Sequence, residues 1–436
     1  MKLINSSDLD FKKQIRNLLW QKNQSQEVSE VVTRVLQGVQ HGGDQAVLKF
    51  TQEFDHADLS SLGYKVTAEQ LETAENSLSE KERSSILESI ASVKAFHKHC
   101  VPKDWCDKNL HGATVGEKFD PINRVGIYIP GGQVPLVSTV VMTVTLAKIA
   151  KVPEVVVVSP PRSDGTIHPY LLAVMSCLGV AEVYAVGGIQ AVGALAFGTE
   201  TLDPVDKIYG PGNAYVMEAK RQVLGICGMD LLPGPSEIMI IADHSANPSY
   251  IAADLLSQAE HGSGKEKIYW ASVGWPELGV LVEEEIEKQL KSCSHASKIS
   301  KVLEESAFLF QCETPQDAID SANLVAPEHL EIHVEMSTLE IYKNGITTAG
   351  CMLLGENTPT VLGDFVAGPS HTLPTGTSGR YFSGLRLEDF MRRTSLISYS
   401  KENAEHARKV VREFSRMEQL DAHGNSLEIR FNHKDK

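Results

Sequence analysis

Val125-Gly126-Ile127-Tyr128-Ile129 is a short β-rich run that ends in the turn Pro130-Gly131-Gly132, and it decides the fold class. Two similar runs follow at helix-length intervals, from Glu154 to Val158 and from Glu182 to Val186. Short, uniformly apolar strands that alternate with helices predict a parallel sheet covered on both faces. Each run ends in a turn rich in glycine or proline, which is where open α/β sheets place their ligands.

The same pattern restarts later in the chain. A strand is predicted from Glu237 to Ile241, after Pro233-Gly234-Pro235, and a helix from Ile251 to Ala259. Two α/β halves are therefore predicted, although no residue-level repeat relates them. Residues 1 to about 105 are charge-rich with helical periodicity, and the adjacent glycines Gly42 and Gly43 are expected to stop one helix.

Composition limits the classes of partner. At 436 residues the chain is longer than a single hydrophobic core usually spans, so two or more domains are expected. Its net charge is −15 and no stripe of Lys and Arg is present, which favours a small-molecule ligand over nucleic acid or an anionic membrane. The N-terminus lacks the apolar core of a signal peptide, and the apolar stretch 134–150 contains serine, threonine and lysine, which argues against a membrane span. Seven scattered cysteines without CxxC are typical of reduced thiols in a cytoplasmic protein.

Side chains that bind zinc or move protons near neutral pH recur in the C-terminal half. They form four close pairs: Gln258 and His261, Glu328 and His329, Asp364 and His371, and Glu418 and His423. Their recurrence predicts one assembled site, which requires that the chain fold so that the four pairs meet.

For each of the first two pairs, the residues alone allow either a functional role or a purely structural one. Gln258 and His261 are three apart on a predicted helix face and suit one metal, but a helix-end histidine is often only hydrogen-bonded. Glu328 and His329 follow Pro327, which suits the first position of a short helical turn. They fit two separate proton-transfer roles, or alternatively a surface glutamate beside a buried histidine.

The other two pairs are also ambiguous when taken alone. Asp364 and His371 lie among glycines and prolines that predict an ordered loop with little helix or strand, where side chains are often functional. An Asx-turn is the structural alternative for Asp364. Glu418 and His423 occupy a predicted helix and its end, where a histidine can simply answer the helix dipole.

No standard nucleotide-binding motif is present, because the sequence lacks a Walker loop, and it also lacks HExxH. The nearest approach to a dinucleotide fingerprint is Gly210-Pro211-Gly212-Asn213-Ala214-Tyr215, which lacks the third glycine. This segment opens a predicted helix, 214–223, whose N-terminus is able to bind an anion.

Several long segments together resemble the L-histidinol dehydrogenase family, in the family's order, from about residue 25 to about residue 430. They are Ile127-Tyr128-Ile129-Pro130-Gly131-Gly132, Gly188-Ile189-Gln190-Ala191, Tyr209-Gly210-Pro211-Gly212-Asn213-Ala214-Tyr215-Val216, Gly234-Pro235-Ser236-Glu237, Asp254-Leu255-Leu256-Ser257-Gln258-Ala259-Glu260-His261, Ala326-Pro327-Glu328-His329-Leu330-Glu331 and Gly368-Pro369-Ser370-His371-Thr372-Leu373-Pro374-Thr375.

The resemblance implies an activity and a set of site residues. The family oxidises L-histidinol through the aldehyde to L-histidine in a four-electron reaction with two NAD, the last steps of histidine biosynthesis, and it uses one zinc ion per subunit. By motif, the zinc ligands are Gln258, His261, Asp364 and His423, and the acid–base pair is Glu328 and His329. The positions that match substrate contacts are Ser236, Gln258, His261, His329, Asp364, His371, Glu418 and His423, and those that match NAD contacts are Tyr128, Gln190 and Asn213.

The resemblance also implies an organisation. It predicts two incomplete Rossmann-like domains, one from residues 25–127 with 237–384 that carries the catalytic and zinc residues, and one from 128–236 that binds NAD. A helical N-terminal extension, 1–24, and a helical C-terminal dimerisation arm, 385–436, flank them. The family is an intertwined homodimer, so Glu418 and His423 are expected to complete the partner's site. The chain departs from the family in the loop 376–381 and at Gly424, changes that affect loop rigidity or substrate fit.

Two other functions fit parts of the pattern. A related zinc- and NAD-dependent enzyme that oxidises another small alcohol, such as dihydroxypropanesulfonate, would share the acid–base pair and the metal. Asp364 and Glu418 make the environment acidic, which favours a cationic amino alcohol over an anionic sulfonate. A non-catalytic metal-binding or regulatory protein on the same fold is the other alternative, and the presence of both Glu328 and His329 argues against it.

Overall fold

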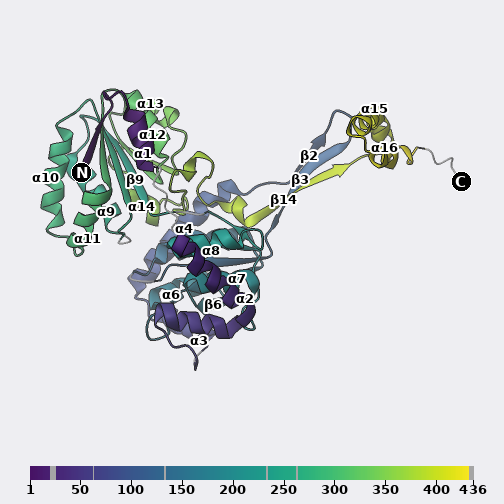
Figure 1. The fold of residues 1–436 in the computed structure, drawn as a ribbon, viewed down its shortest axis with the longest axis horizontal. Helices are drawn as coiled ribbons and strands as arrows, with labels where there is room; N and C mark the ends of the chain where they lie inside the picture. The colour runs from purple at the N-terminus through teal and green to yellow at the C-terminus, as the bar shows by residue number, and fades with distance from the viewer. Residues whose placement is uncertain (20–25, 62, 132–133, 232–233, 262–263, 432–436) are drawn as a thin grey trace.

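The computed structural model describes the chain except residues 20–25, 62, 132–133, 232–233, 262–263 and 432–436. The described residues form two parallel sheets covered by helices and a separate antiparallel sheet that leads to a helical tip (Figure 1). The predicted α/β fold class is therefore confirmed.

The first parallel sheet has the strand order β6-β5-β4-β7-β8. Its strands are β4 (Arg124–Tyr128), β5 (Glu154–Ser159), β6 (Glu182–Ala185), β7 (Lys207–Tyr209) and β8 (Gly228–Met229), and the connecting helices are α5 (Val137–Ile149), α6 (Pro169–Cys177), α7 (Gly188–Phe197) and α8 (Ala214–Val223). The three strands predicted from apolar runs are confirmed. The chain adds strands on one side of β4 and then on the other, so the order reverses between β4 and β7, where open α/β sheets bind ligands.

The second parallel sheet repeats this order, as β11-β10-β9-β12-β13, and adds β1 at its edge. Its strands are β1 (Lys2–Asn5), β9 (Glu237–Ala242), β10 (Lys267–Val273), β11 (Ala307–Cys312), β12 (His329–His333) and β13 (Cys351–Leu354). Its helices are α1 (Phe11–Leu19), α9 (Pro248–Ala259), α10 (Leu278–Leu290), α11 (Ala296–Ser306), α12 (Pro315–Val325), α13 (Leu339–Gly345) and α14 (Thr360–Phe365). The prediction of two α/β halves is thus confirmed by topology, without any residue-level repeat.

The N-terminal helices pack differently from the predicted domain division. They are α2 (Gln26–Asp55), α3 (Ala68–Asn76) and α4 (Glu80–His97). The paired glycines were expected to stop the first helix, and at Gly43 the backbone is non-helical, so that α2 is two helical stretches joined at a kink. These helices contact α7, α6 and α5 of the first sheet, because the apolar face of α2, including Val35 and Val39, is buried in that sheet's core. Residues 26–97 therefore belong with 128–229 rather than with 237–384. Within the predicted extension 1–24, β1 pairs with β11.

The C-terminal arm is a ribbon with a helical tip that projects from the two sheets (Figure 1). Its ribbon consists of β2 (Trp105–Lys108), β3 (Thr114–Pro121) and β14 (Met391–Ser398), and its tip consists of α15 (Lys401–Glu418) and α16 (Asp421–Glu428). Single 3-10 turns lie at Lys98–Cys100, Ser378–Arg380 and Leu387–Phe390. The prediction of a wholly helical arm is wrong for residues 391–398, which pair antiparallel with β3. Among the described helices, none is long and apolar enough to cross a membrane.

A buried ion pair holds the turn after β7 in place. The side chain of Lys220 on α8 is fully buried and contacts the carboxylate of Asp230, and its Nζ also donates to the backbone oxygens of Gly210 and Leu231, each at 3.0 Å. The Gly210 N–H donates to Asp230 Oδ2 at 2.7 Å. The backbone of Gly210 has a φ angle of +105°, and a Cβ there would lie 2.0 Å from the backbone oxygen of Tyr128. Only glycine therefore fits this close approach.

We expect the substitution Lys220→Met to destabilise the fold by about 3–5 kcal/mol, because it leaves Asp230 as a buried carboxylate without its cation. Urea unfolding measures the loss. Lys148→Met is the matched control, since Lys148 is exposed and its Nζ donates only to the Gly179 carbonyl. Equal losses in the two variants would contradict a structural role for the buried pair.

Candidate active site

The predicted catalytic residues gather at the edge of the second sheet where its central strands begin. β9 begins at Glu237, directly after Ser236, and β12 begins at His329, directly after Glu328. In a β-α-β unit the helix runs antiparallel to its strands, so the end of α9, which carries Gln258, lies at this same edge. The site is therefore at the amino edge of this sheet, whereas the first sheet has its switch point at the carboxyl edge of β4 and β7.

Three local predictions around these residues are wrong. Glu328 and His329 do not open a helical turn, because His329 starts β12 and pairs with Ile238 and Cys351 on the two neighbouring strands. Asp364 is not in a loop, since it lies in α14, although His371 does lie in irregular structure. His423 does not end a helix. The chain breaks at Gln419 in a left-handed conformation, and His423 falls in the first turn of α16.

Glu328 and His329 are buried and face Asp364. The backbone N–H of Glu237 donates to Glu328 Oε2 at 2.8 Å, and His329 Nδ1 lies 3.8 Å from the same oxygen. On the other side of the imidazole, His329 Nε2 lies 3.6 Å from Asp364 Oδ1, and His371 Nδ1 lies 3.5 Å from that oxygen. The carboxylate of Asp364 thus lies between the imidazoles of His329 and His371. The carboxyl of Glu328 lies on the other side of the His329 ring.

This burial separates the protonation states of the three groups. Burial raises the pKa of Glu328 well above its ordinary value, and the nearby carboxyls of Glu237 and Asp364 add to the rise. Burial lowers the pKa of His329, partly offset by the charge of Asp364. Burial alone would raise the pKa of Asp364. The hydrogen bond to His371 and the charges of the neighbouring imidazoles outweigh that effect, so the pKa is lowered. A neutral imidazole therefore lies between the ionised Asp364 carboxylate and a Glu328 carboxyl whose pKa is raised.

Three of the four predicted metal ligands line one small cavity. Gln258, His261 and Asp364 share it with Thr360. The Gln258 amide is 3% exposed, and its Nε2 finds no hydrogen-bond partner among the described residues. The predicted substrate contacts Ser236 and His371 belong to the same region, because Ser236 hydrogen-bonds Glu328 and His371 lies beside Asp364.

The site faces the first sheet. His371 Nε2 lies 3.5 Å from the hydroxyl of Thr139 on α5, the helix that follows β4. The Ser370 hydroxyl approaches the backbone oxygen of Met142 on the same helix at 3.5 Å. The loop that carries His371 therefore joins the amino edge of one sheet to the neighbourhood of the carboxyl edge of the other.

The predicted NAD-contacting residues lie around the switch point of the first sheet. The Tyr128 hydroxyl, at the end of β4, accepts from the Gly188 N–H at 3.2 Å, and Gln190 Nε2 donates to Asp55 Oδ2 at 2.9 Å. Asn213 Oδ1 accepts from the N–H groups of Tyr215 and Val216. The N-terminus of α8, predicted to be able to bind an anion, is therefore already capped by Asn213.

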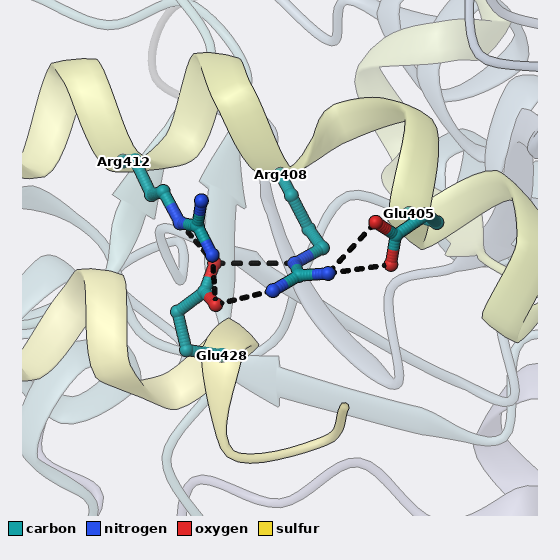
Figure 2. Close-up of polar contacts among 4 residues, drawn as sticks. All are labelled: Glu405, Arg408, Arg412 and Glu428. Carbon is teal, nitrogen blue, oxygen red and sulfur yellow. Dashed lines mark hydrogen bonds and ion pairs between the residues drawn. The ribbon is translucent and has the colours of Figure 1, made fainter. Parts of the chain in front are cut away.

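Glu418 and His423 are exposed on the arm tip, far from α9 and α14 of the same chain (Figure 1). Glu428 of α16 accepts from Arg408 and Arg412 of α15, with the closest nitrogens at 2.6 and 2.5 Å, and Arg408 also binds Glu405 (Figure 2). These contacts fasten α16 against α15. Within one chain, the structure does not bring this pair to the other three.

The sequence interpretation missed two groups of buried and half-buried polar residues. Asp254, Glu331 and His333 place ligand-type atoms within 4.8 Å of one another, and Asp254 also lines the cavity. Their only signal was position, because Asp254 lies one helical turn before Gln258 and Glu331 lies two residues after His329. Asp55 beside Gln190 was also missed, since it ends an otherwise ordinary amphipathic helix.

Comparison with known proteins identifies relatives over nearly the whole chain. The family model for histidinol dehydrogenase matches residues 19–431. The histidinol dehydrogenase of Synechococcus sp. is 38% identical over 92% of this chain and 91% of its own, and that of Bacillus subtilis is 37% identical over 93% and 94%.

The same relationship holds for the structure. The crystal structure of histidinol dehydrogenase from Elizabethkingia anophelis matches with a TM-score of 0.93 and 31% sequence identity, and the match covers 99% of this chain and 98% of that one. The alternative of a sulfonate-oxidising relative gains no support from these matches. The chain belongs to the histidinol dehydrogenase family of NAD-dependent oxidoreductases of histidine biosynthesis.

Proposed function

We propose that this chain oxidises L-histidinol through L-histidinal to L-histidine at the amino edge of β9 and β12, with two NAD as hydride acceptors. The observation that carries this proposal is the buried neutral imidazole of His329, held between Glu328 and Asp364 beside a cavity lined by Gln258 and His261. A buried base next to convergent polar groups is the arrangement that proton removal from an alcohol requires.

The residues of the cavity fit a zinc ion. Gln258, His261 and Asp364 supply a mixed oxygen and nitrogen donor set, and the fourth ligand is His423 of a second copy. The buried Gln258 amide can offer its Oε1 to a cation, and the lowered pKa of the buried Asp364 keeps that carboxylate ionised, as a metal ligand requires. When bound, zinc supplies Lewis-acid polarisation and orients the substrate's nitrogens and hydroxyl.

His329 is the base in both oxidations. Its neutral ring accepts the hydroxyl proton of L-histidinol while the carbinol hydride leaves to NAD, which gives the aldehyde. After that proton has returned to solvent, His329 accepts a hydroxyl proton from the aldehyde hydrate as the second hydride leaves. Its lowered pKa keeps the ring able to accept a proton at neutral pH.

Glu328 acts between the two oxidations. Its raised pKa makes the ionised form a strong base, so once it has lost its proton it can take one from the water that adds to the aldehyde carbon. Ser236 and the Glu237 N–H hold the carboxyl in place for this step. The ionised Asp364 and the partner's Glu418 make the substrate pocket acidic, which suits the ammonium group of L-histidinol and disfavours a sulfonate.

The proposed NAD-binding part, residues 128–236, contains the first sheet apart from most of β4. The strand order of that sheet reverses between β4 and β7, and Tyr128, Gln190 and Asn213 lie around that point. Asp55 supports this region by accepting from Gln190. The close approach of Gly210 to the backbone oxygen of Tyr128 holds the ends of β4 and β7 together at this point.

The proposed enzyme is a homodimer in which the arm of one chain reaches the site of the other. The arm tip presents Glu418 and His423 away from its own body, and it exposes large apolar side chains such as Phe414 and Met417. Ser415 accepts from the Gly424 N–H at 3.0 Å, and a Cβ at Gly424 would lie 2.7 Å from its hydroxyl, so glycine at this family-variable position packs α16 tightly beside His423. None of the cysteines in the described residues is disulfide-bonded, which fits the proposed cytoplasmic location.

His329→Asn is expected to lower the rate of NADH formation by about 10²–10⁴-fold, because it removes the proton acceptor. Bound zinc is expected to be unchanged, since His329 is not a proposed ligand. Stopped-flow absorbance and metal analysis of the purified variant measure the two effects. His244→Asn is the control, because His244 also pairs with a carboxylate but lies on the opposite edge of the sheet. Normal turnover in the His329→Asn variant would contradict the assignment of His329 as the base.

Co-expression tests whether the arm acts on the partner. His329→Asn damages the body of a chain and His423→Asn damages only its arm, so each variant alone should be inactive. In a mixed dimer, one site receives both defects and the other receives neither. Random pairing makes about half of the dimers mixed, and activity should recover to about one quarter of the wild-type value. Absence of recovery in purified mixed dimers would place Glu418 and His423 in their own chain's site.

Asp55 predicts a pH effect on stability. Burial raises the pKa of its carboxyl from 3.8 to about 6, although the hydrogen bond from Gln190 opposes the rise. The folded protein therefore holds this proton more tightly than the unfolded chain, and the stabilisation that this gives is lost as pH rises from about 4 to about 6. Asp55→Asn keeps the hydrogen-bond acceptor and should raise stability at pH 7 by about 1–2 kcal/mol, after allowance for partial exposure, with little effect at pH 4.

Thermal unfolding at both pH values checks this difference. Asp58→Asn is the opposite-sign control, because the hydrogen bonds from the Ser60 hydroxyl and N–H lower the pKa of Asp58. That variant should lose a little stability at pH 7. A pH-independent effect of Asp55→Asn would show that its carboxyl titrates normally in the folded protein.

A further inference from the structure

Four polar side chains meet beside the proposed zinc and proton-transfer residues, two of them (Asp254 and Thr360) at the cavity wall, and the proposed mechanism uses none of them. Glu331 Oε1 accepts from both the backbone N–H and the hydroxyl of Thr360, each at 2.7 Å. Glu331 Oε2 lies 3.2 Å from His333 Nε2, and a carboxyl oxygen of Asp254 lies within 4.8 Å of a ligand-type atom of each. Glu331 and His333 are fully buried.

The spacing relates this cluster to the site. Asp254 precedes Gln258 by four residues on α9, and Thr360 precedes Asp364 by four residues on α14, so each lies one turn away on the same helix face. Glu331 follows His329 by two residues and therefore points to the same face of β12. The elements α9, β12 and α14, which carry Gln258, His329 and Asp364, thus also supply the cluster, with one side chain from each helix and two from β12.

We propose that Glu331 is a positioning residue that ties α9, β12 and α14 together, and thereby fixes Gln258, His329 and Asp364 relative to one another. The proposal rests on the zinc site of the proposed function. The two hydrogen bonds that Glu331 accepts from Thr360 fix where α14 begins. The contact between Glu331 and Asp254 fixes the last turns of α9. A shift of either helix would move a metal ligand away from the base.

The chemistry of the cluster favours this role over core packing. A carboxylate without exposed surface is costly to bury, and an apolar side chain of similar size would pack there at lower cost. Burial and the charge of Glu331 raise the pKa of Asp254, so Asp254 is able to donate the proton that the two carboxyls share. Because Glu331 Oε1 already accepts two protein donors, the cluster is better suited to hold helices than to hold a second metal ion.

Zinc affinity tests the proposal without relying on turnover. We expect Glu331→Met, which removes both acceptor oxygens, to weaken zinc binding about 10–100-fold, as loss of groups that orient metal ligands typically does. Glu331→Gln keeps an acceptor for Thr360 and a donor for Asp254, and should stay within about 3-fold of wild type. Thr360→Val removes only the hydroxyl and should weaken zinc binding by an intermediate factor. Competition with a chromophoric chelator, on the metal-free dimer, measures all three.

Matched measurements separate positioning from general destabilisation. Asp243→Asn alters another buried carboxylate on the same sheet, which accepts from Ser245 and Glu335 beyond the opposite ends of β9 and β12, and it should leave zinc affinity unchanged. If Glu331→Met does not fold, Thr360→Val and Glu331→Gln still carry the test. Wild-type affinity in Thr360→Val and Glu331→Met would overturn the proposal, as would a loss in Asp243→Asn equal to theirs.

Metal stoichiometry distinguishes the remaining outcomes. Wild-type protein is expected to bind one zinc per subunit, and Glu331→Gln should also bind one. Two ions in wild type and one in Glu331→Gln would overturn positioning in favour of a second metal site. Wild-type protein that binds no zinc would refute the proposed zinc function itself. Zinc binding by wild type and equally by the Glu331 and Thr360 variants would refute only the positioning role.

Discussion

The site depends on the parallel pairing of β12 with β9. This register places His329 opposite Ile238 and Glu331 opposite Ile240, so both polar side chains point to the face that α9 covers. A one-residue slip would turn both to the other face, where Leu330 and Ile332 pack with α12 and α13. The buried apolar residues on the two faces therefore specify the register, and the register specifies which face carries the chemistry.

Burial then gives the site its reactivity. In water, a glutamate and a histidine differ little from their ordinary pKa values, and neither is tuned for proton transfer. In the folded chain, desolvation raises the pKa of Glu328 and lowers that of His329, while the hydrogen bond to His371 and the neighbouring imidazoles hold down the pKa of Asp364. His329 lies within 4 Å of both carboxyls, that of its sequence neighbour Glu328 and that of the sequence-distant Asp364 on α14. The division of roles into base, water-activating carboxyl and metal ligand follows from that difference in environment.

The sequence predicts much of this architecture, and its failures have physical causes. The apolar runs at residues 125–129, 154–158 and 182–186 form strands because parallel sheets bury both faces. Asp364 was expected in a loop because of its neighbouring glycines, yet residues 360–365 form a single helical turn that Glu331 anchors at Thr360. Such a tertiary contact leaves no local pattern. Position relative to the sheet was equally invisible, because the site lies at strand starts rather than at the Gly/Pro turns that follow strand ends. Residues 26–97 pack with the first sheet for a similar reason, since an amphipathic face does not indicate its partner.

The central claim is that one site carries out both oxidations, with His329 as the base each time. The most direct test is the number of NADH molecules formed for each L-histidinol consumed, measured by absorbance at saturating NAD and zinc with the product identified by chromatography. The account predicts two NADH and L-histidine as the only product. One NADH per substrate, with the aldehyde released, would contradict it.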